Sequence, residues 1–300
     1  MNSALALLSH SIDYAGLFPP ASLDMKSAVK NYAAYLESLD VWMLGRFIVP
    51  VSRLEEFESA ALNVLPRDID SRAWGLSVLG GDNLHEETKK IVAFNDKHWR
   101  PTNGGRAIID AVEIKAHTQK EIQQAASLVP KEIAAYFEIP ISDDPASLID
   151  MIADAGGRAK VRTGGITQDA FPKADDLVHF TAKCVRAGVP FKATAGLHHP
   201  IRSTYPLTYE KDSPKGMMYG FLNLLLASAF IFDGVKPEEA VEVLEEESKD
   251  RFRFEDDGIN WRKRKITNEK ISATRRTVVI SFGSCSFREP TDELKSMDLL

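Results

Sequence analysis

The chain has 300 residues and a formal net charge of −6, and its residues are 44% hydrophobic and 27% charged. This composition is typical of a globular protein. The excess of acidic residues argues against a nucleic-acid-binding face, which needs clustered lysine and arginine. The one basic cluster, residues 262–265, is short and predicts a solvated turn, so we expect no nucleic-acid partner.

The cysteines and the apolar stretches indicate the compartment. The sequence holds only two cysteines, Cys184 and Cys285, which excludes a disulfide framework and favours a reducing compartment. Residues 221–232 form the longest apolar run, shorter than the roughly 20 residues that a membrane-spanning helix needs. Residues 1–8 contain no basic residue, unlike the start of a signal peptide. We predict a cytoplasmic protein with no membrane partner, and a buried helix over 221–232 that is also a candidate homodimer interface.

Strand-like and helix-like segments alternate from one end of the chain to the other. The predicted strands lie at 11–17, 42–50, 74–80, 110–116, 134–140, 158–164, 190–196 and 277–283. Parallel neighbours in a sheet need a crossover of a dozen or more residues, which the amphipathic segments between these strands supply. Eight such units predict a closed (β/α)8 barrel, the TIM-barrel fold, as a single domain over residues 1–300. The first strand lacks a following G-x-G-x-x-G turn, which disfavours a dinucleotide-binding sheet.

Local signals mark several helix starts and ends. Ser52 and Thr118 each precede a glutamate by three residues, which is the spacing of a capping box. Asp144 followed by Pro145 suits a helix start. Gly188 is expected to end the helix after the sixth strand, because glycine readily adopts the left-handed conformation at a helix end.

The long segment between strands seven and eight departs from this repeat. We expect a buried helix over 215–232, followed by an insertion at about 234–276 within the same domain. The insertion should contain a charged helix over 237–249, a hairpin that turns at Asp257 and Gly258, and a helix capped by Thr267.

Ionisable residues interrupt several predicted strands, although a barrel strand covered on both faces should be apolar. They are Asp13, Arg46, Glu113, Lys115, Glu138, Lys160, Arg162 and Lys192. Side chains alternate along a strand, and the residues between these charges are apolar, so the charged side should face the barrel interior. Five bases against three acids leave a net charge of +2 inside a protein of −6, which favours a small anionic ligand. The alternative is an ion-pair network that only fills the barrel.

Glycines and small residues follow the last three predicted strands. Thr194 and Gly196 follow strand seven, and Gly283 and Ser284 follow strand eight, where this fold often binds phosphate through backbone N–H groups. The alternative is that the glycines only turn the chain. Cys285 ends strand eight, and we expect it to close a turn because no Cys-His signature surrounds it.

The loop after strand seven is long enough to act as a lid, and it contains His198, His199 and Arg202. An imidazole titrates near neutral pH, so either histidine is a candidate general acid or base. Adjacent residues usually point apart, so we expect only one of the two histidines to face the site.

The segments KVRTGG at 160–165 and FKATAG at 191–196 resemble the class I aldolases with a barrel fold, especially the deoxyribose-phosphate aldolase group. That family carries a Schiff-base lysine on strand six and a second lysine on strand seven that tunes the first. Here Arg162 stands at the Schiff-base position, where it cannot form an imine, and Lys192 matches the second lysine. The resemblance to the aldolases covers these two segments only. The chain as a whole resembles a bacterial family of such barrels, and this second resemblance implies no activity.

The preferred function is an aldolase-like lyase that acts on a small carboxylated or phosphorylated carbonyl compound, without metal or cofactor. Lys192 or Lys160 would form the imine, and Glu138, Glu113 or His198 would move the proton. The residues expected to bind the substrate are Asp13, Arg46, Lys115, Arg162, Thr194, Gly196, His199, Arg202, Gly283 and Ser284.

Two other functions stay open. Asp13, Glu113, Glu138 and His198 could bind a divalent metal in a lyase, isomerase or hydrolase, although the sequence lacks a spaced His pair and lysines would compete for the carboxylates. The chain could also be a non-catalytic barrel that binds a ligand, because the fold alone does not establish catalysis.

Overall fold

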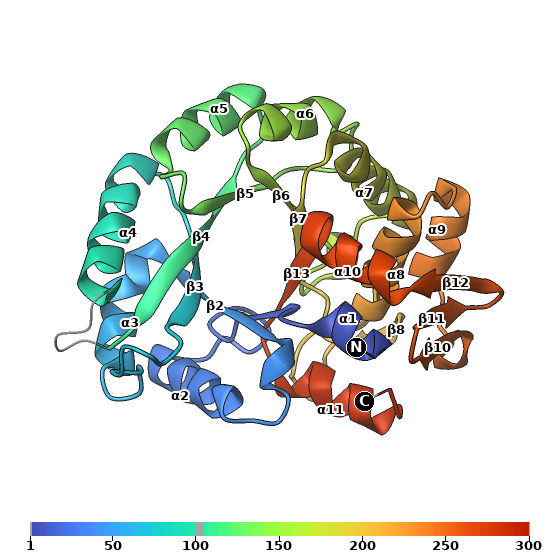
Figure 1. Cartoon of the computed structure of the whole chain (residues 1–300), viewed down its shortest axis with the longest axis horizontal. Coiled ribbons are helices and arrows are strands. Elements are labelled where there is room, and N and C mark those ends of the chain that lie inside the picture. The colour runs from blue at the N-terminus through green and yellow to red at the C-terminus, as the bar shows by residue number, and fades with distance from the viewer. Residues whose placement is uncertain (1, 100–104, 300) are drawn as a thin grey trace.

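The computed structural model describes residues 2–99 and 105–299. Eight parallel strands close into a barrel in the order β1-β13-β7-β6-β5-β4-β3-β2, which confirms the predicted (β/α)8 barrel. Figure 1 shows helices α2 to α7 around the outside of the strands. The barrel strands are β1 (Ile12–Tyr14), β2 (Leu44–Pro50), β3 (Trp74–Leu79), β4 (Ala107–Lys115), β5 (Ala134–Glu138), β6 (Arg158–Arg162), β7 (Phe191–Thr194) and β13 (Val279–Ser284).

The strand bounds agree with the sequence prediction to within three residues at every end. The first strand, predicted over 11–17, ends at Tyr14 because the chain turns there, with the Phe18 N–H donating to the Ala15 carbonyl. The eighth strand, predicted over 277–283, begins at Val279 because Thr277 is the last residue of the preceding helix.

The helices cover the strands, and two of their predicted signals are confirmed. They are α1 (Ser3–Leu8), α2 (Met25–Leu36), α3 (Leu54–Ala61), α4 (Leu84–Trp99), α5 (Gln119–Leu128), α6 (Ala146–Asp154), α7 (Ala174–Ala187), α8 (Phe221–Phe232), α9 (Pro237–Leu244), α10 (Asn268–Thr277) and α11 (Arg288–Ser296). Thr118 forms the capping box of α5 with Glu121, and Gly188 ends α7 at a φ of 66°. The cap predicted at Ser52 is wrong, because Ser52 lies in a short 3-10 turn and α3 begins without a side-chain cap.

The segment between β7 and β13 contains more strand than the sequence predicts. The helix predicted over 215–232 starts only at Phe221, because β8 (Ser203–Pro206) pairs with β9 (Lys215–Met218) as an antiparallel ribbon. The predicted hairpin is present, and a third strand completes a small antiparallel sheet. Thr267, the last residue of the third strand, caps α10 as predicted. This sheet consists of β10 (Phe252–Glu255), β11 (Gly258–Trp261) and β12 (Arg264–Thr267), and Figure 1 shows it at the edge of the molecule beside α9.

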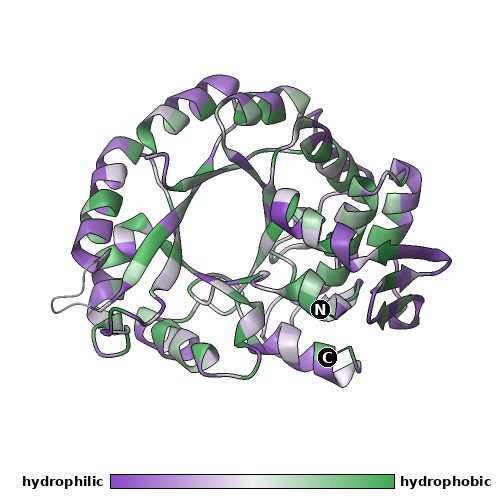
Figure 2. Ribbon diagram, viewed as in Figure 1, coloured by the Kyte–Doolittle hydropathy of each residue, from purple (hydrophilic) through white to green (hydrophobic). Residues whose placement is uncertain are grey.

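Figure 2 shows strands that are largely hydrophobic with hydrophilic stretches among them, and helices in which hydrophobic and hydrophilic residues alternate. The apolar helix α8 is buried from Phe221 to Ile231 and contacts α7, α9 and α10 of the same chain. The chain itself therefore covers this helix, and the homodimer expectation draws no support from it. None of the helices in residues 2–99 and 105–299 combines the length and apolarity that crossing a membrane requires.

Candidate active site

A cavity of about 430 Å³ opens at the carboxyl ends of the barrel strands, between the loops that follow β1, β6, β7 and β13. This end of the barrel is where enzymes of the fold place their chemistry. The predicted site residues that line the cavity are Glu113, Lys115, Glu138, Lys160, Arg162, Thr194, Gly196, His198 and Gly283. The structure thus brings together residues from five strands and from the loop that follows β7.

A row of charged residues crosses four neighbouring strands. Lys115 on β4 is the register partner of Glu138 on β5, which pairs with Lys160 on β6, which pairs with Lys192 on β7. Register partners on parallel strands point to the same side of the sheet. The alternation seen in the sequence therefore becomes one row of charges, two of which, Lys160 and Lys192, are buried.

Lys192 is the innermost charge of the row. Its Nζ donates to Asp13 Oδ2 at 2.6 Å and to Glu113 Oε1 at 2.7 Å, and the Ser281 and Ser77 hydroxyls donate to the same two oxygens. Burial would lower the pKa of Lys192, but the charges of Asp13 and Glu113 raise that pKa above its ordinary value. The ammonium group therefore stays charged at neutral pH, and it does not line the cavity.

Lys160 belongs to the same ion-pair network but lines the cavity. Its Nζ lies 2.7 Å from Glu113 Oε2 and 2.7 Å from Glu138 Oε2, and a Glu138 oxygen lies 3.8 Å from an Arg162 nitrogen. Burial would raise the pKa of Glu113, but the charges and hydrogen bonds of Lys160 and Lys192 lower it well below its ordinary value. An ion-pair network, which the sequence analysis kept open as the alternative, is thus present, and Lys160 is the buried lysine of that network that faces open space.

His198 and Cys285 form part of the cavity rim. The Nδ1 atom of His198 lies 3.4 Å from the Ser284 hydroxyl and 3.6 Å from the Cys285 sulfur, and the Tyr209 hydroxyl lies 3.4 Å from that sulfur. Burial and the neighbouring His199 lower the pKa of His198 to about 4, and burial raises the pKa of the Cys285 thiol. Both groups are therefore neutral at pH 7. The sequence predicted a turn residue at Cys285 and offered no signal for Tyr209.

The opposite wall of the cavity is apolar. It consists of Phe18, Pro19 and Pro20 in the loop after β1, with Ile48 on β2 and Leu79 on β3. Sequence reasoning missed this wall, because apolar residues on barrel strands have the same pattern as the core. The cavity thus has one charged side and one apolar side.

Arg46 lies away from this cavity. It is near the start of β2, and its guanidinium forms two hydrogen bonds with Asp110, of 2.6 Å and 2.8 Å, in a separate cavity lined also by His10 and Trp74. Alternation along a strand gives the direction of a side chain but not its height in the barrel. The structure therefore does not bring Arg46 to the other predicted site residues.

Four further predicted residues do not line the cavity. Asp13 is buried behind Lys192, and the Ser284 hydroxyl contacts His198 from outside the cavity lining. His199 pairs with a glutamate of α11, so only His198 of the two histidines lines the cavity. Arg202 pairs with glutamates after α9.

The donor set expected for the metal hypothesis is not assembled. In the part of the chain that the structure describes, Asp13, Glu113 and Glu138 pair with lysines and form no group of metal ligands with His198. The carboxylates are thus already engaged by ammonium groups.

Two glycines at the site are explained by close backbone approach. Gly196 has a φ of 74°, and a Cβ atom built on Gly164 would lie 3.0 Å from the Gly196 Cα and 2.5 Å from the Phe171 ring. These glycines let the loops after β6 and β7 touch. The alternative to a phosphate site, that the glycines only allow the backbone to turn and pack closely, therefore accounts for Gly164 and Gly196.

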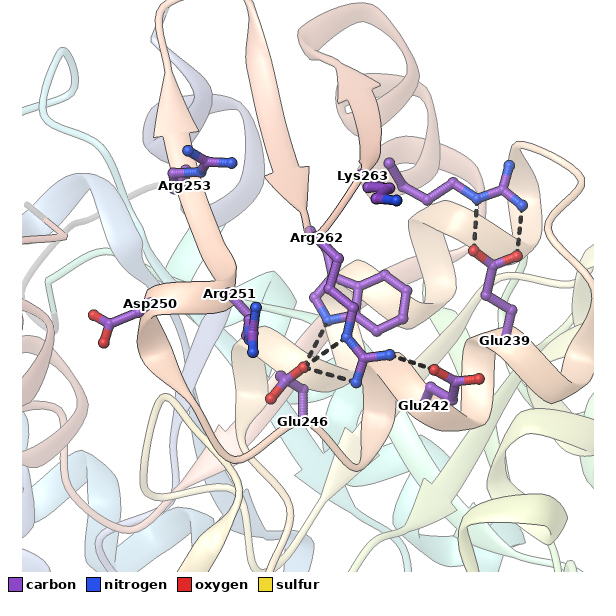
Figure 3. Close-up of a pocket in the computed structure, with 10 residues that line it drawn as sticks. Glu239, Glu242, Glu246, Asp250, Arg251, Arg253, Arg262 and Lys263 are labelled. Carbon is purple, nitrogen blue, oxygen red and sulfur yellow. Dashed lines mark hydrogen bonds and ion pairs between the residues drawn. The ribbon is translucent and has the colours of Figure 1, made fainter.

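The basic cluster at 262–265 is exposed, and much of its charge is paired. Arg262 and Lys263 lie in a turn as predicted, whereas Arg264 and Lys265 lie on β12, because they pair with β11. Arg262 contacts Glu242 and Glu246, and Arg264 forms two hydrogen bonds of 2.6 Å with Glu239 (Figure 3). This pairing leaves little excess positive charge for a polyanion.

Comparisons with family models and with curated proteins find no match. Among solved structures, a nitroalkane oxidase from Streptomyces ansochromogenes is similar over 66% of this chain and 62% of its own length, at 13% identity and a TM-score of 0.31. The chain therefore spans less than two thirds of that structure. A similarity of this size carries no argument about activity.

Proposed function

We propose that the chain is a lyase in which Lys160 forms an imine with a small carbonyl compound that carries an anionic group. The observation that carries this proposal is the different placement of the two buried lysines. Both lysines pair with two carboxylates, but Lys160 lines the cavity, whereas Lys192 lies behind it. An imine needs an amine within reach of the carbonyl carbon, and of the two buried lysines Lys160 is the one that lines the cavity.

Glu138 is suited to accept the proton that Lys160 must release. Its Oε2 atom lies 2.7 Å from the Lys160 Nζ, and the residue also lines the cavity. The amine attacks the carbonyl carbon, the resulting carbinolamine loses water after Glu138 returns the proton to its hydroxyl, and the protonated imine forms. In a substrate with a hydroxyl group on Cβ, Glu138 then takes the β-hydroxyl proton, the Cα–Cβ bond breaks, and the Cβ fragment leaves as a carbonyl compound while the electron pair forms an enamine through Cα and the nitrogen. Protonation of the enamine at Cα by Glu138 and hydrolysis of the imine by water release the second product and restore the Lys160 amine.

Lys192 and Glu113 position this pair. Glu113 bridges the two ammonium groups through its two oxygens, at 2.7 Å to each. Lys192 thereby contributes a fixed positive charge beside the reacting amine.

The two-sided cavity supports a substrate that is anionic at one end and apolar at the other. Lys115 and Arg162 place positive charge on one wall, where a carboxylate or phosphate would bind. Ile48 and Leu79 on the opposite wall would contact the apolar part of the same molecule. We therefore expect a short carbon chain with an anionic group at one end and a carbonyl near it.

Borohydride trapping tests the proposal. The protein would be incubated with a panel of 2-oxo acids and phosphorylated aldehydes, reduced, digested and analysed by mass spectrometry. We expect a stable mass increase at Lys160, its loss in Lys160→Arg, and no change in Lys89→Arg, which alters an exposed lysine on α4. Arginine keeps the charge that pairs with Glu113 and Glu138 but cannot form an imine.

A non-catalytic ligand-binding barrel is the second candidate, because the lysine network is already complete without a ligand. On this alternative, anionic compounds bind with the same affinity to the wild type and to Lys160→Arg, and no adduct forms.

The two buried free cysteines fit a reducing compartment, so we also propose a cytoplasmic location.

A further inference from the structure

We propose that His199, Glu289 and Glu293 form a binding site for one divalent transition-metal ion, with Zn²⁺ as the best match. The site lies outside the lysine network, where the loop after β7 meets α11. Imidazole nitrogen and carboxylate oxygen are both common ligands of zinc, whereas Mg²⁺ and Ca²⁺ take oxygen ligands.

The fold brings the three donors to one point. Glu289 and Glu293 are four residues apart on α11, so their side chains lie on the same face of that helix. His199 reaches this face from the loop after β7, and its Nδ1 lies 2.6 Å from Glu293 Oε1. One donor atom from each of the three residues lies within 4.8 Å of the other two. Donor atoms on one zinc ion stand roughly 3.3 Å apart. The three donor atoms therefore need to approach one another by at most about 1.5 Å, which small side-chain rotations can provide.

The charge at this point is not balanced by the protein. Among residues 2–99 and 105–299, no lysine or arginine forms an ion pair with Glu289 or Glu293, whose side chains are only 24% and 30% exposed. The basic side chains that approach them are the rings of His198, 3.8 Å from Glu289, and His199, 2.6 Å from Glu293. Two carboxylates held together in a partly buried place repel each other, and a divalent cation offsets both charges at once.

Neighbouring residues hold two of the proposed ligands in place. The His199 ring stacks on the Tyr205 ring at a centroid distance of 3.5 Å and an angle of 10°, and the Tyr209 hydroxyl donates to Glu289 at 2.9 Å. Such outer contacts orient the ligands of protein metal sites. Three protein ligands also leave one position of a tetrahedral ion open to water.

An ion here would connect the loop after β7 to the C-terminal helix. This loop also carries His198, which lines the cavity, so the ion would fix one edge of the cavity rim. The inference does not depend on the imine chemistry, because none of the three ligands touches Lys160 or its carboxylates.

Zinc titration of the full-length protein tests the site. Protein treated with chelator and then desalted would be titrated with Zn²⁺ by calorimetry and, separately, with Co²⁺ by visible absorption. We expect one equivalent of Zn²⁺ with a rise in the unfolding temperature, and Co²⁺ bands typical of low coordination number. Glu289→Gln leaves the His199–Glu293 contact in place and should weaken Zn²⁺ binding at least about tenfold.

Matched variants separate the site from other surface donors. His199→Ala and Glu293→Gln should also lose binding, whereas His179→Ala and Glu242→Gln, which change a histidine and a glutamate elsewhere on the surface, should not. Circular dichroism of each variant before titration shows that it is folded. Failure of the wild type to bind one equivalent at micromolar Zn²⁺, or equal binding by the folded Glu289→Gln variant, would overturn the proposal.

Discussion

Lys160 and Lys192 are register partners on neighbouring strands, yet their ammonium groups occupy different environments. Glu113 contacts both, through one oxygen each, so the two cations share one carboxylate. Lys192 is enclosed by Asp13 as well, while Lys160 extends toward the cavity and Glu138. The proposed reaction depends on this difference, because one lysine supplies fixed charge and the other supplies the nucleophile.

Replacing Lys192 should destabilise the fold strongly. In Lys192→Met the carboxylates of Asp13 and Glu113 lose a shared cation in a buried place, so we expect the free energy of unfolding to fall by about 3–5 kcal/mol. Lys115→Met is the control, because Lys115 is exposed at the end of β4, and it should change the free energy by less than about 0.5 kcal/mol. Urea unfolding measures both, and equal effects of the two changes would contradict this interpretation of the network.

The same network predicts how stability depends on pH. The pKa of Glu113 is lower in the folded state than in the unfolded state, so its contribution to stability is present above the unfolded value of about 4.3 and is lost as the pH falls below it. We expect the free energy of unfolding of the wild type to decrease in this range. Glu113→Gln keeps the hydrogen bond from Ser77 but cannot titrate, so its slope should be shallower by up to about 1.4 kcal/mol per pH unit.

Urea unfolding at pH 3 to 8 compares the two slopes. Identical slopes below about pH 4.3 would show that Glu113 does not lose its ion pairs to protonation in this range. The comparison concerns slopes, so a lower absolute stability of the variant does not affect it.

Arg162 and Lys115 should select anionic substrates. Each of the changes Arg162→Gln and Lys115→Gln removes a positive charge from the cavity wall, so adduct formation with anionic carbonyl compounds should weaken about tenfold. Lys115→Gln is the cleaner change, because Arg162 also pairs with Glu138 at 3.8 Å. Adduct formation with a neutral aldehyde of the same length should not change. If both compounds are affected equally, the two residues act on the fold and not on the substrate charge.

The sequence predicted the barrel and its charged interior because both follow from local periodicity. Alternation with period two placed Glu113, Glu138, Lys160 and Lys192 on the inner side of their strands, and the closed order of strands brought them together. The same rule does not give the height of a residue along the barrel axis. It therefore could not show that Arg46 lies near the start of β2, away from the cavity that the other residues line.

Contacts between distant segments were beyond local reasoning. His199 meets Glu293 across 94 positions of the chain, and Tyr209 meets Cys285 across 76. No periodicity or motif links such pairs, since each depends on how a loop folds over a helix or a strand end. The prediction of a helix over 215–232 was wrong in its first part for a similar reason. Residues 215–218 form a strand, because they pair with β8.

Gly196 should not tolerate a side chain. Gly196→Ala places a Cβ atom 2.9 Å from the Phe171 ring and 3.0 Å from the Gly164 Cα, at a φ of 74°. We expect the free energy of unfolding to fall by more than about 3 kcal/mol, because backbone strain of about 1 kcal/mol adds to the steric overlap. Gly156→Ala isolates the strain, since that glycine has a φ of 64° with nothing within 4 Å of the added atom. A thermal or urea unfolding series in which both variants lose the same stability would mean that the loops after β6 and β7 can separate without cost, and their contact would then not shape the cavity.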